Sequence, residues 1–250
     1  MLNYHRNGTG QALVMQHGFY GGGGYFAHQA AALGHMYDVI APDLPGFAGS
    51  NAVDAVSTIE ALSIAQVGLL DELGIDKFHL LGHSMGGMVA LQTALDHPDR
   101  VQKLVLYATN SSGNLQGRFE TFDETKARVR AEGVDAVARK VTATWFAEYE
   151  RAPMFQFCLS AGAGAARAAI EGALEAFQKW DVSHRLHELQ MPVLVISGDK
   201  DRSYSVDGLV QLTKGIENAE LCLLPGGAHC VHLEQSDVFN SVLARFFSKR

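Results

Sequence analysis

One stretch of the chain, residues 78–91, constrains the fold more than any other. It combines a short apolar strand, a sharp turn that spells Gly82-x-Ser84-x-Gly86, and an apolar helix. This is the pattern of a nucleophile elbow, a strained turn that lifts a serine hydroxyl clear of the backbone. Side chains at the two flanking glycines would collide with that turn, and Gly87 lets the helix approach a neighbour. The alternative interpretation is a glycine-rich turn with a surface serine.

Strands and helices alternate over the first 110 residues and again after residue 189. Apolar runs predict strands at 12–16, 37–41, 101–108, 193–197 and 219–224, and residues 1–7 are expected to form an edge strand. The sequence Ser57-Thr58-Ile59-Glu60 has the form of a capping box at the start of a helix. Such alternation predicts an α/β fold with a mostly parallel central sheet flanked by helices. Ligands of these sheets bind at the carboxyl ends of the strands.

The alternation stops between residues 112 and 188. This segment is too long for a loop, and helices are expected over 123–145, with a break at Gly133, and over 163–180. We therefore expect a core domain of residues 1–111 and 189–250. The segment 112–188 is expected to be an inserted helical cap, or lid, over the strand ends.

Composition argues against several classes of function. The net charge of −7 disfavours nucleic acid, whose phosphates require a basic surface. No apolar run has the length of a membrane span, and no signal peptide is visible, so a membrane partner is not expected. Cys158, Cys222 and Cys230 form no Cys-x-x-Cys pair, which fits a reduced, cytoplasmic protein. The oligomeric state is left open.

Four consecutive glycines follow the first long strand, at 21–24. The residues that accompany glycine in a phosphate loop are missing, so nucleotide binding is not expected. We interpret the stretch as a flexible loop whose backbone amides face a ligand. The histidines are scattered and form no His-Glu-x-x-His pattern, so neither a metal nor another cofactor is expected.

Two further strand ends carry polar residues. Gly198-Asp199-Lys200-Asp201 follows the strand at 193–197, and Pro225-Gly226-Gly227-Ala228-His229 follows the strand at 219–224. With Ser84, this gives the chain order serine, acid, histidine at one edge of a parallel sheet. Acyl transfer requires such a set: a nucleophile, a base that deprotonates it, and a carboxylate that orients the base.

The chain resembles the α/β-hydrolase-fold serine hydrolases, and within them the 3-oxoadipate enol-lactonase and carboxylesterase group. The resemblance covers roughly residues 1–110 and 189–250, although this chain begins closer to the first matched motif than many relatives do. The shared motifs are His17-Gly18, Asp43-Leu44-Pro45-Gly46-Phe47-Ala48-Gly49-Ser50, Gly82-His83-Ser84-Met85-Gly86-Gly87, Gly198-Asp199-Lys200-Asp201, and Gly227-Ala228-His229 with His232-Leu233-Glu234. The subgroup is indicated by an Arg/Ala-rich helix that leads to Trp145-Phe146 and by Trp180-Asp181.

The resemblance implies a role for each residue of the catalytic triad. Ser84 is expected to be the nucleophile, and His229 the general base and then the acid for the leaving group. Asp201 is expected to orient the base. His232 and Asp199 are the alternatives for the base and the acid. We expect His232 instead to support the following helix, and Asp199 to shape a turn.

The backbone amides of Phe19 and Met85 are expected to form the oxyanion hole, and His17 to hold its loop by hydrogen bonds. Trp145 is expected to bind the substrate. Phe155 and Phe157 are further candidates for the acyl pocket, with packing inside the cap as the alternative. For Cys230, beside the histidine, packing is the favoured interpretation over a catalytic thiol.

The implied function is hydrolysis of a carboxylic ester or lactone of a small molecule through an acyl-enzyme on Ser84. Because the base must be neutral to accept a proton, activity is expected to rise across about pH 6–7, where histidines titrate. Alternatives on the same triad are hydrolysis of a carbon–carbon bond in a diketone and cofactor-free perhydrolysis. Dehalogenases and epoxide hydrolases of this fold carry an aspartate at the elbow, so Ser84 argues against both. A non-enzymatic ligand receptor is disfavoured because the triad and both oxyanion loops are present.

Overall fold

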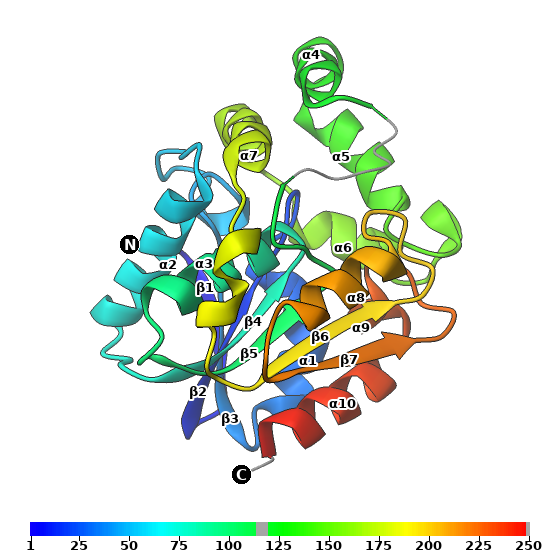
Figure 1. Cartoon of the computed structure of the whole chain (residues 1–250). Coiled ribbons are helices and arrows are strands. Elements are labelled where there is room, and N and C mark those ends of the chain that lie inside the picture. Colours follow the sequence, from blue (N-terminus) through cyan, green and yellow to red (C-terminus); the bar gives the residue numbers. More distant parts are fainter. Residues whose placement is uncertain (114–119, 249–250) are drawn as a thin grey trace.

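The computed structural model describes residues 1–113 and 120–248, and shows a central sheet flanked by helices (Figure 1). The strands of the described residues form one seven-stranded sheet in the order β1-β3-β2-β4-β5-β6-β7. The strands are β1 (Tyr4–Asn7), β2 (Gln11–Gln16), β3 (Tyr37–Pro42), β4 (Phe78–His83), β5 (Val101–Tyr107), β6 (Val193–Gly198) and β7 (Ala219–Leu224). β1 pairs antiparallel with β3 at one edge, and the other described pairs are parallel. The mostly parallel sheet and its edge strand confirm the prediction from sequence.

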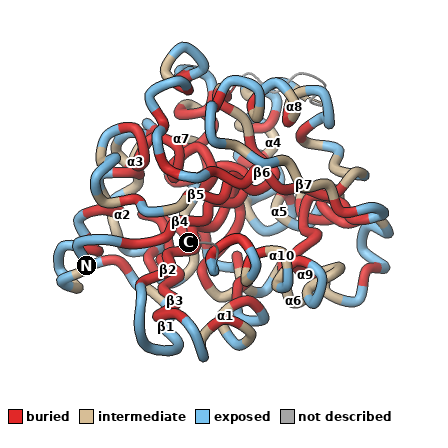
Figure 2. The backbone as a smooth tube through the Cα atoms, turned by 60° about the horizontal axis from the view of Figure 1, so that its bottom comes forward, coloured by how far each residue is buried: buried red, intermediate tan, exposed pale blue. Residues whose placement is uncertain are grey.

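Helices cover the sheet on both faces, which explains its continuous apolar strands. Every residue of β3, β4 and β6 is buried, as expected for parallel strands between two layers of helices. Figure 2 shows α2, α3 and α8 along one side of the buried strands and α1 and α10 along the other. These helices are α1 (Ala27–Leu33), α2 (Ile59–Glu72), α3 (Met85–Asp96), α8 (Val206–Lys214) and α10 (Ser236–Ser248), with the short α9 (Val231–Glu234) before α10.

The predicted capping box at the start of α2 is wrong. The N-cap is Thr58, whose hydroxyl accepts a hydrogen bond from the Ala61 amide at 3.1 Å. With Thr58 at this position, Glu60 stands one residue too early to return a bond to the N-cap amide. A complete capping box begins α4 instead, where Thr121 and Glu124 each bond the other's backbone amide.

Between β5 and β6 the described residues form four α-helices, here called the inserted helices. They are α4 (Phe122–Glu132), α5 (Val134–Ala143), α6 (Phe155–Ala161) and α7 (Arg167–Lys179). In Figure 1, α4, α5 and α7 lie above the sheet. Gly133 separates α4 from α5 as expected, with a φ of 88°. Residues 114–119 of the predicted cap lie outside the described residues, and the division at 112–188 stays a prediction.

Short 3-10 turns complete the connections, namely η1 (Gly23–Phe26), η2 (Ala48–Ser50), η3 (Tyr149–Arg151) and η4 (Ser183–Glu188). The helix α6 falls between the two helical runs whose limits were predicted, within the segment expected to be a helical cap. Across residues 1–113 and 120–248, the structure contains no helix long and apolar enough to cross a membrane.

The glycine stretch Gly21–Gly24 is packed against the protein itself. The Gly23 amide donates to the Asp43 carboxylate at 2.7 Å. A Cβ at Gly22 would lie 2.2 Å from the carbonyl oxygen of Ala161 in α6. The expectation of a flexible loop whose amides face a ligand is therefore wrong here, because these glycines serve close backbone packing.

Candidate active site

Ser84 lies in the sharp turn between β4 and α3, with φ 56° and ψ −120°. This strained conformation is rare for a residue with a side chain. A Cβ at Gly82 would lie 2.1 Å from the Gly86 carbonyl oxygen, and one at Gly86 would lie 2.3 Å from the Gln16 carbonyl oxygen. The steric need for both glycines is therefore confirmed.

The rear of the elbow packs against the end of β5. The Thr109 hydroxyl donates to the Ser84 carbonyl at 2.7 Å. A Cβ at Gly87 would lie 2.5 Å from the Thr109 side chain, so Gly87 allows α3 to approach its neighbour as predicted.

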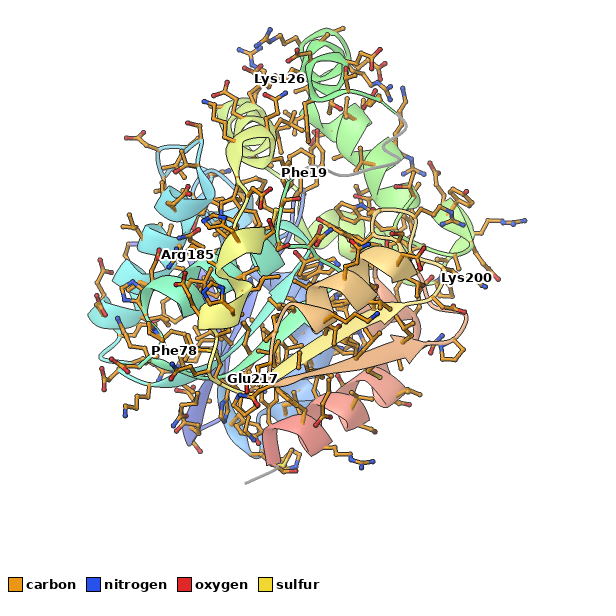
Figure 3. All side chains as sticks on the ribbon, viewed as in Figure 1. Phe19, Phe78, Lys126, Arg185, Lys200 and Glu217 are labelled. Atoms are coloured by element: carbon orange, nitrogen blue, oxygen red, sulfur yellow. The ribbon has the colours of Figure 1, made fainter. Side chains whose placement is uncertain are left out.

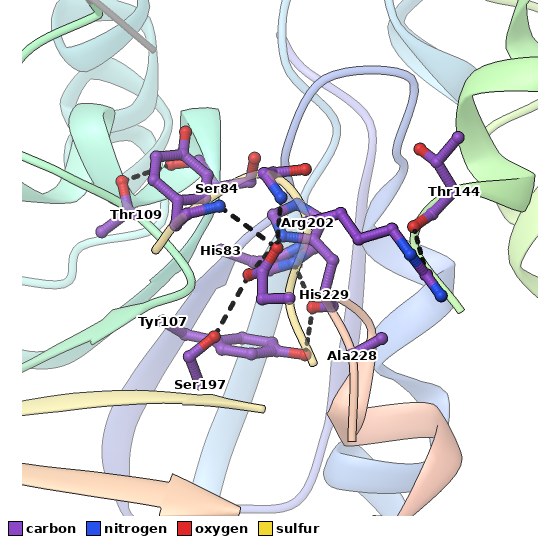
Figure 4. A network of polar contacts seen from close by, with 12 residues as sticks. His83, Ser84, Tyr107, Thr109, Thr144, Ser197, Arg202, Ala228 and His229 are labelled. Atoms are coloured by element: carbon purple, nitrogen blue, oxygen red, sulfur yellow. Dashed lines mark hydrogen bonds and ion pairs between the residues drawn. The ribbon is translucent and has the colours of Figure 1, made fainter. Parts of the chain in front are cut away.

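His229 lies next to the elbow (Figure 4), and it forms a buried pair with Asp201. The His229 Nδ1 lies 2.9 Å from Asp201 Oδ2, and both side chains are only 1% exposed. The same oxygen accepts a hydrogen bond from the Ser197 hydroxyl at 3.2 Å, and Oδ1 accepts one from the Ser203 amide at 2.7 Å. The carboxylate is thus fixed, and it favours the histidine tautomer with hydrogen on Nδ1 and a lone pair on Nε2.

Tyr107 and His83 fix the backbone of His229. Its carbonyl accepts hydrogen bonds from the Tyr107 hydroxyl at 2.8 Å and from His83 Nε2 at 3.0 Å. Burial lowers the pKa of His83 well below its usual value, so the ring is neutral. Sequence reasoning missed both residues, although His83 stands between Gly82 and Ser84 in the elbow motif.

Asp199 and His232, the alternatives for the acid and the base, do not line the cavity that contains Ser84. Asp199 accepts a hydrogen bond from the Gly226 amide at 2.7 Å and shapes a turn. The His232 Nδ1 lies 2.9 Å from the Tyr107 hydroxyl, and burial lowers the pKa of His232 to about 3. His232 is therefore a neutral, buried ring within the core.

The loop that precedes Phe19 runs directly against the elbow. A Cβ at Gly18 would lie 2.9 Å from the Ser84 Cβ. His17 fixes this loop, because its Nδ1 donates to the Gly18 carbonyl at 2.8 Å and its Nε2 accepts from the Leu44 amide at 2.9 Å. Burial lowers the pKa of His17, in agreement with the neutral form that these two bonds require.

Two amides close to Ser84 have no partner among the described hydrogen bonds, those of Phe19 and Met85. Met85 is the first residue of α3, where backbone N–H groups lack acceptors within the helix and the helix dipole favours negative charge. These amides are the donors expected from sequence for an oxyanion.

A cavity of about 300 Å³ contains Ser84 and His229 in its wall. Its other lining residues are Phe19, Glu120, Thr125, Val141, Thr144, Trp145, Tyr149, Phe177, Arg202, Ser203 and Tyr204. In Figure 3, Phe19 lies between the sheet and the inserted helices. The Trp145 and Tyr204 rings each have their centroid 5.7 Å from that of His229. The structure therefore brings together the predicted Ser84, His229, Phe19 and Trp145.

Of the two interpretations that the sequence left open for Phe155 and Phe157, the structure favours packing over the acyl pocket. Phe155 is fully buried with its ring 6.2 Å from that of Phe146, and Phe157 contacts the His28 ring at 5.6 Å. Neither lines the cavity, because both belong to the packing of α6. Cys230 is fully buried, and burial raises the pKa of its thiol well above the usual value, which agrees with packing.

Sequence reasoning missed most of the cavity wall, including Tyr149, Phe177 and Tyr204. Of these residues, only Tyr204 could have been found from the local sequence, because it lies three positions after Asp201. Within residues 1–113 and 120–248, no group of three or more His, Cys, Asp or Glu residues is placed to hold a metal ion.

The fold and the elbow define a class of protein. The chain belongs to the alpha/beta hydrolase fold family, whose pattern matches residues 11–236, and it is a hydrolase. It is 29% identical to a 2-hydroxy-6-oxo-6-phenylhexa-2,4-dienoate hydrolase of Comamonas testosteroni, over 100% of this chain and 92% of that protein. It is 32% identical to a protein of Variovorax paradoxus that carries the name carbamate hydrolase RutD, over 99% and 96% of the two chains.

A solved structure agrees with the predicted subgroup. The enol-lactonase from Burkholderia xenovorans LB400 matches with a TM-score of 0.91 and 27% identity, over 99% of this chain and 96% of that one. The resemblance to the enol-lactonase group is thereby confirmed.

Proposed function

We propose that the chain hydrolyses a carboxylic ester or lactone of a small molecule through an acyl-enzyme on Ser84. The observation that carries this proposal is the buried pair of His229 and Asp201, joined at 2.9 Å, in which His229 shares the wall of one cavity with Ser84. The likeness to an enol-lactonase over nearly the whole chain supports the choice of bond.

In the first half of the reaction, His229 Nε2 takes the proton of Ser84 as Oγ attacks the carbonyl carbon. Asp201 holds the imidazole in the required tautomer and stabilises the imidazolium that forms. The amides of Phe19 and Met85 donate to the developing oxyanion, and one such donor is typically worth about 2.7–4 kcal/mol. His229 then gives its proton to the leaving oxygen, which stays attached to the acyl chain when the substrate is a lactone.

In the second half, water replaces the leaving group. His229 Nε2 takes a proton from this water as the water oxygen attacks the acyl carbon, and it returns a proton to Ser84 Oγ as the acyl–Oγ bond breaks and the acid leaves. The mostly apolar cavity walls favour a small, largely apolar acyl group. We further propose that residues 112–188 act as a cap, because α5 and α7 contribute Val141 and Phe177 to the cavity.

A second candidate on the same three residues is hydrolysis of a carbon–carbon bond in a diketone. The 29% identity to a protein named as a dienoate hydrolase supports it, since the substrate in that name contains no ester bond. Ser84 would again attack the carbonyl carbon, and His229 would give its proton to the carbon that leaves.

Acid release across a panel of short-chain esters, thioesters, lactones and diketones tests the proposal, with pH indicator dye as the readout. We expect release from esters or lactones by the wild type and none by Ser84→Ala. Cleavage of the diketones alone would favour the second candidate. A folded wild type that releases acid from no member of the panel would contradict both.

A further inference from the structure

A short segment after α5, Thr144–Ala147, is joined to both loops that carry the proposed acid and base. We call it the wall segment, because its Trp145 lines the cavity with its ring 5.7 Å from the His229 ring. Its hydrogen bonds to the core use backbone groups of the segment, so they fix its path independently of its side chains.

Arg202 joins the wall segment to the acid loop. Its Nη1 donates to the carbonyls of Thr144 at 3.2 Å and Phe146 at 2.9 Å, and its Nη2 donates to the Ala147 carbonyl at 3.2 Å. Figure 4 shows Arg202 reaching across to Thr144. Arg202 directly follows Asp201, so three charge-assisted bonds connect this segment to the residue next to the acid.

Glu234 joins the wall segment to the base loop. Its Oε1 accepts from the Ala147 amide at 2.7 Å, and its Oε2 accepts from the Ala228 amide at 2.6 Å. Ala228 directly precedes His229. One carboxylate therefore holds the amides of two chain segments that lie far apart in sequence.

A third link runs through the backbone alone. The Cys230 amide donates to the Trp145 carbonyl at 3.0 Å. The residues on both sides of His229 are thus bound to the wall segment, one directly and one through Glu234.

We propose that Arg202 and Glu234 are positioning residues, which fix the wall segment to the acid and base loops and so hold the Trp145 ring and the His229 imidazole in register. This inference rests on the proposed function, because it treats His229 as the base. A displacement of about 1 Å in such a site can cost on the order of 100-fold in rate. Loss of either bridge should therefore reduce turnover of a folded enzyme.

Glu234→Gln is the first test, because the amide keeps the size of the side chain but turns an N–H donor toward one of the two backbone N–H groups. We expect kcat/KM for the best ester to fall roughly tenfold at 25 °C, with an unchanged circular dichroism spectrum. The matched control is Glu171→Gln, which removes a half-buried charge on α7 that pairs with the exposed Arg130. This control should keep the wild-type kcat/KM.

A double-mutant cycle with Trp145→Ala separates positioning from simple stabilisation of the fold. If Glu234 acts through the wall segment, Glu234→Gln should cost much less in the Trp145→Ala background than in the wild type. A lower Tm with unchanged kcat/KM at 25 °C would overturn the proposal. Arg202→Lys breaks the other bridge, retains the charge, and provides the same test if Glu234→Gln does not fold.

Ser84→Ala keeps this inference distinct from the proposed function. Activity that survives Ser84→Ala would contradict the proposed function itself. Activity that is lost in Ser84→Ala but unchanged in folded Glu234→Gln and Arg202→Lys would contradict only the positioning roles.

Discussion

The sheet core and the inserted helices differ in how closely their backbones pack and in where their charged side chains lie. In the core, backbones approach so closely that a single Cβ at Gly82 or Gly86 would collide with a carbonyl oxygen. The core also buries neutral histidines, among them His83 and His232, whose pKa values are lowered by burial. Such close contacts leave the backbone little room to move, so the position of Ser84 is fixed.

The inserted helices instead carry ion pairs at their surface. These pairs include Arg130 with Glu171, Arg139 with Glu150, and Lys140 with Glu132. Exposed pairs contribute little stability and are screened by salt. The difference indicates that the core fixes the chemistry, while the exposed charges of the inserted helices can change with little loss of stability.

The largest expected effect is on the chemistry of the core. Asp201→Asn should keep the fold but lower kcat by about 10⁴-fold, because an amide no longer favours the histidine tautomer that accepts the Ser84 proton. Asp199→Asn, two positions away, removes a carboxylate that shapes a turn and should leave kcat close to wild type. Steady-state kinetics on the best substrate of the panel measures both. Near-normal turnover in Asp201→Asn would show that another residue orients the base.

The second largest effect is expected on stability, from substitutions in the elbow. Gly82→Ala should lower the free energy of unfolding by about 3 kcal/mol or more, because the new Cβ meets backbone that cannot move aside. The control is Gly68→Ala in α2, where a Cβ has nothing within 4 Å. That change should stabilise the protein by about 0.5–1 kcal/mol. Urea unfolding measures the free energy of unfolding of both variants. Equal values would contradict the close packing at Gly82.

Acid should weaken the core through its buried histidines. The pKa of His232 is about 3 in the folded chain, against an ordinary value of 6.5. Below about pH 6.5 the unfolded chain therefore binds a proton that the folded chain does not. The stabilisation is fully present above that pH and is lost as the pH falls toward 3, by about 3 kcal/mol at pH 4.

The variant His232→Asn isolates this contribution. The fall in unfolding free energy between pH 7 and pH 4 should be smaller in His232→Asn than in the wild type. His97→Gln, at the end of α3, is the control and should keep the wild-type dependence. An identical pH dependence in all three proteins would show that His232 binds its proton as readily in the folded chain as in the unfolded chain.

The smallest effect is expected in the inserted helices. Arg130→Gln removes the exposed pair with Glu171, and should change neither kcat/KM nor the midpoint of urea unfolding beyond the scatter between replicates. High salt should likewise leave the wild-type midpoint almost unchanged. A large loss of stability in Arg130→Gln would show that the inserted helices depend on specific pairs as the core depends on specific contacts.

Features encoded in local sequence could be predicted. The apolar run of β7 gave its limits, Ala219–Leu224, and the elbow motif gave the strained turn at Ser84. Parallel strands place the loops after them at one edge, which is why Asp201 and His229 could be assigned to one site from the amino-acid sequence alone.

Features that depend on distant contacts could not be predicted. The glycines at Gly21–Gly24 looked like a ligand loop because Asp43 and Ala161, which pack against them, are remote in sequence. The roles of Arg202 and Glu234 depend on a segment more than 50 positions away. The position of Phe155 could not be decided from sequence, because an aromatic residue in a helix can face a cavity or a core with the same sequence pattern.

The most direct test of the account is to trap the acyl-enzyme. The wild type would be mixed with an activated ester, quenched in acid within one turnover, digested, and examined by mass spectrometry. We predict that the acyl mass is found on the peptide that contains Ser84, and that Ser84→Ala shows neither this adduct nor turnover. Turnover by the wild type with no adduct on that peptide, together with retained activity in Ser84→Ala, would contradict a nucleophilic role for Ser84.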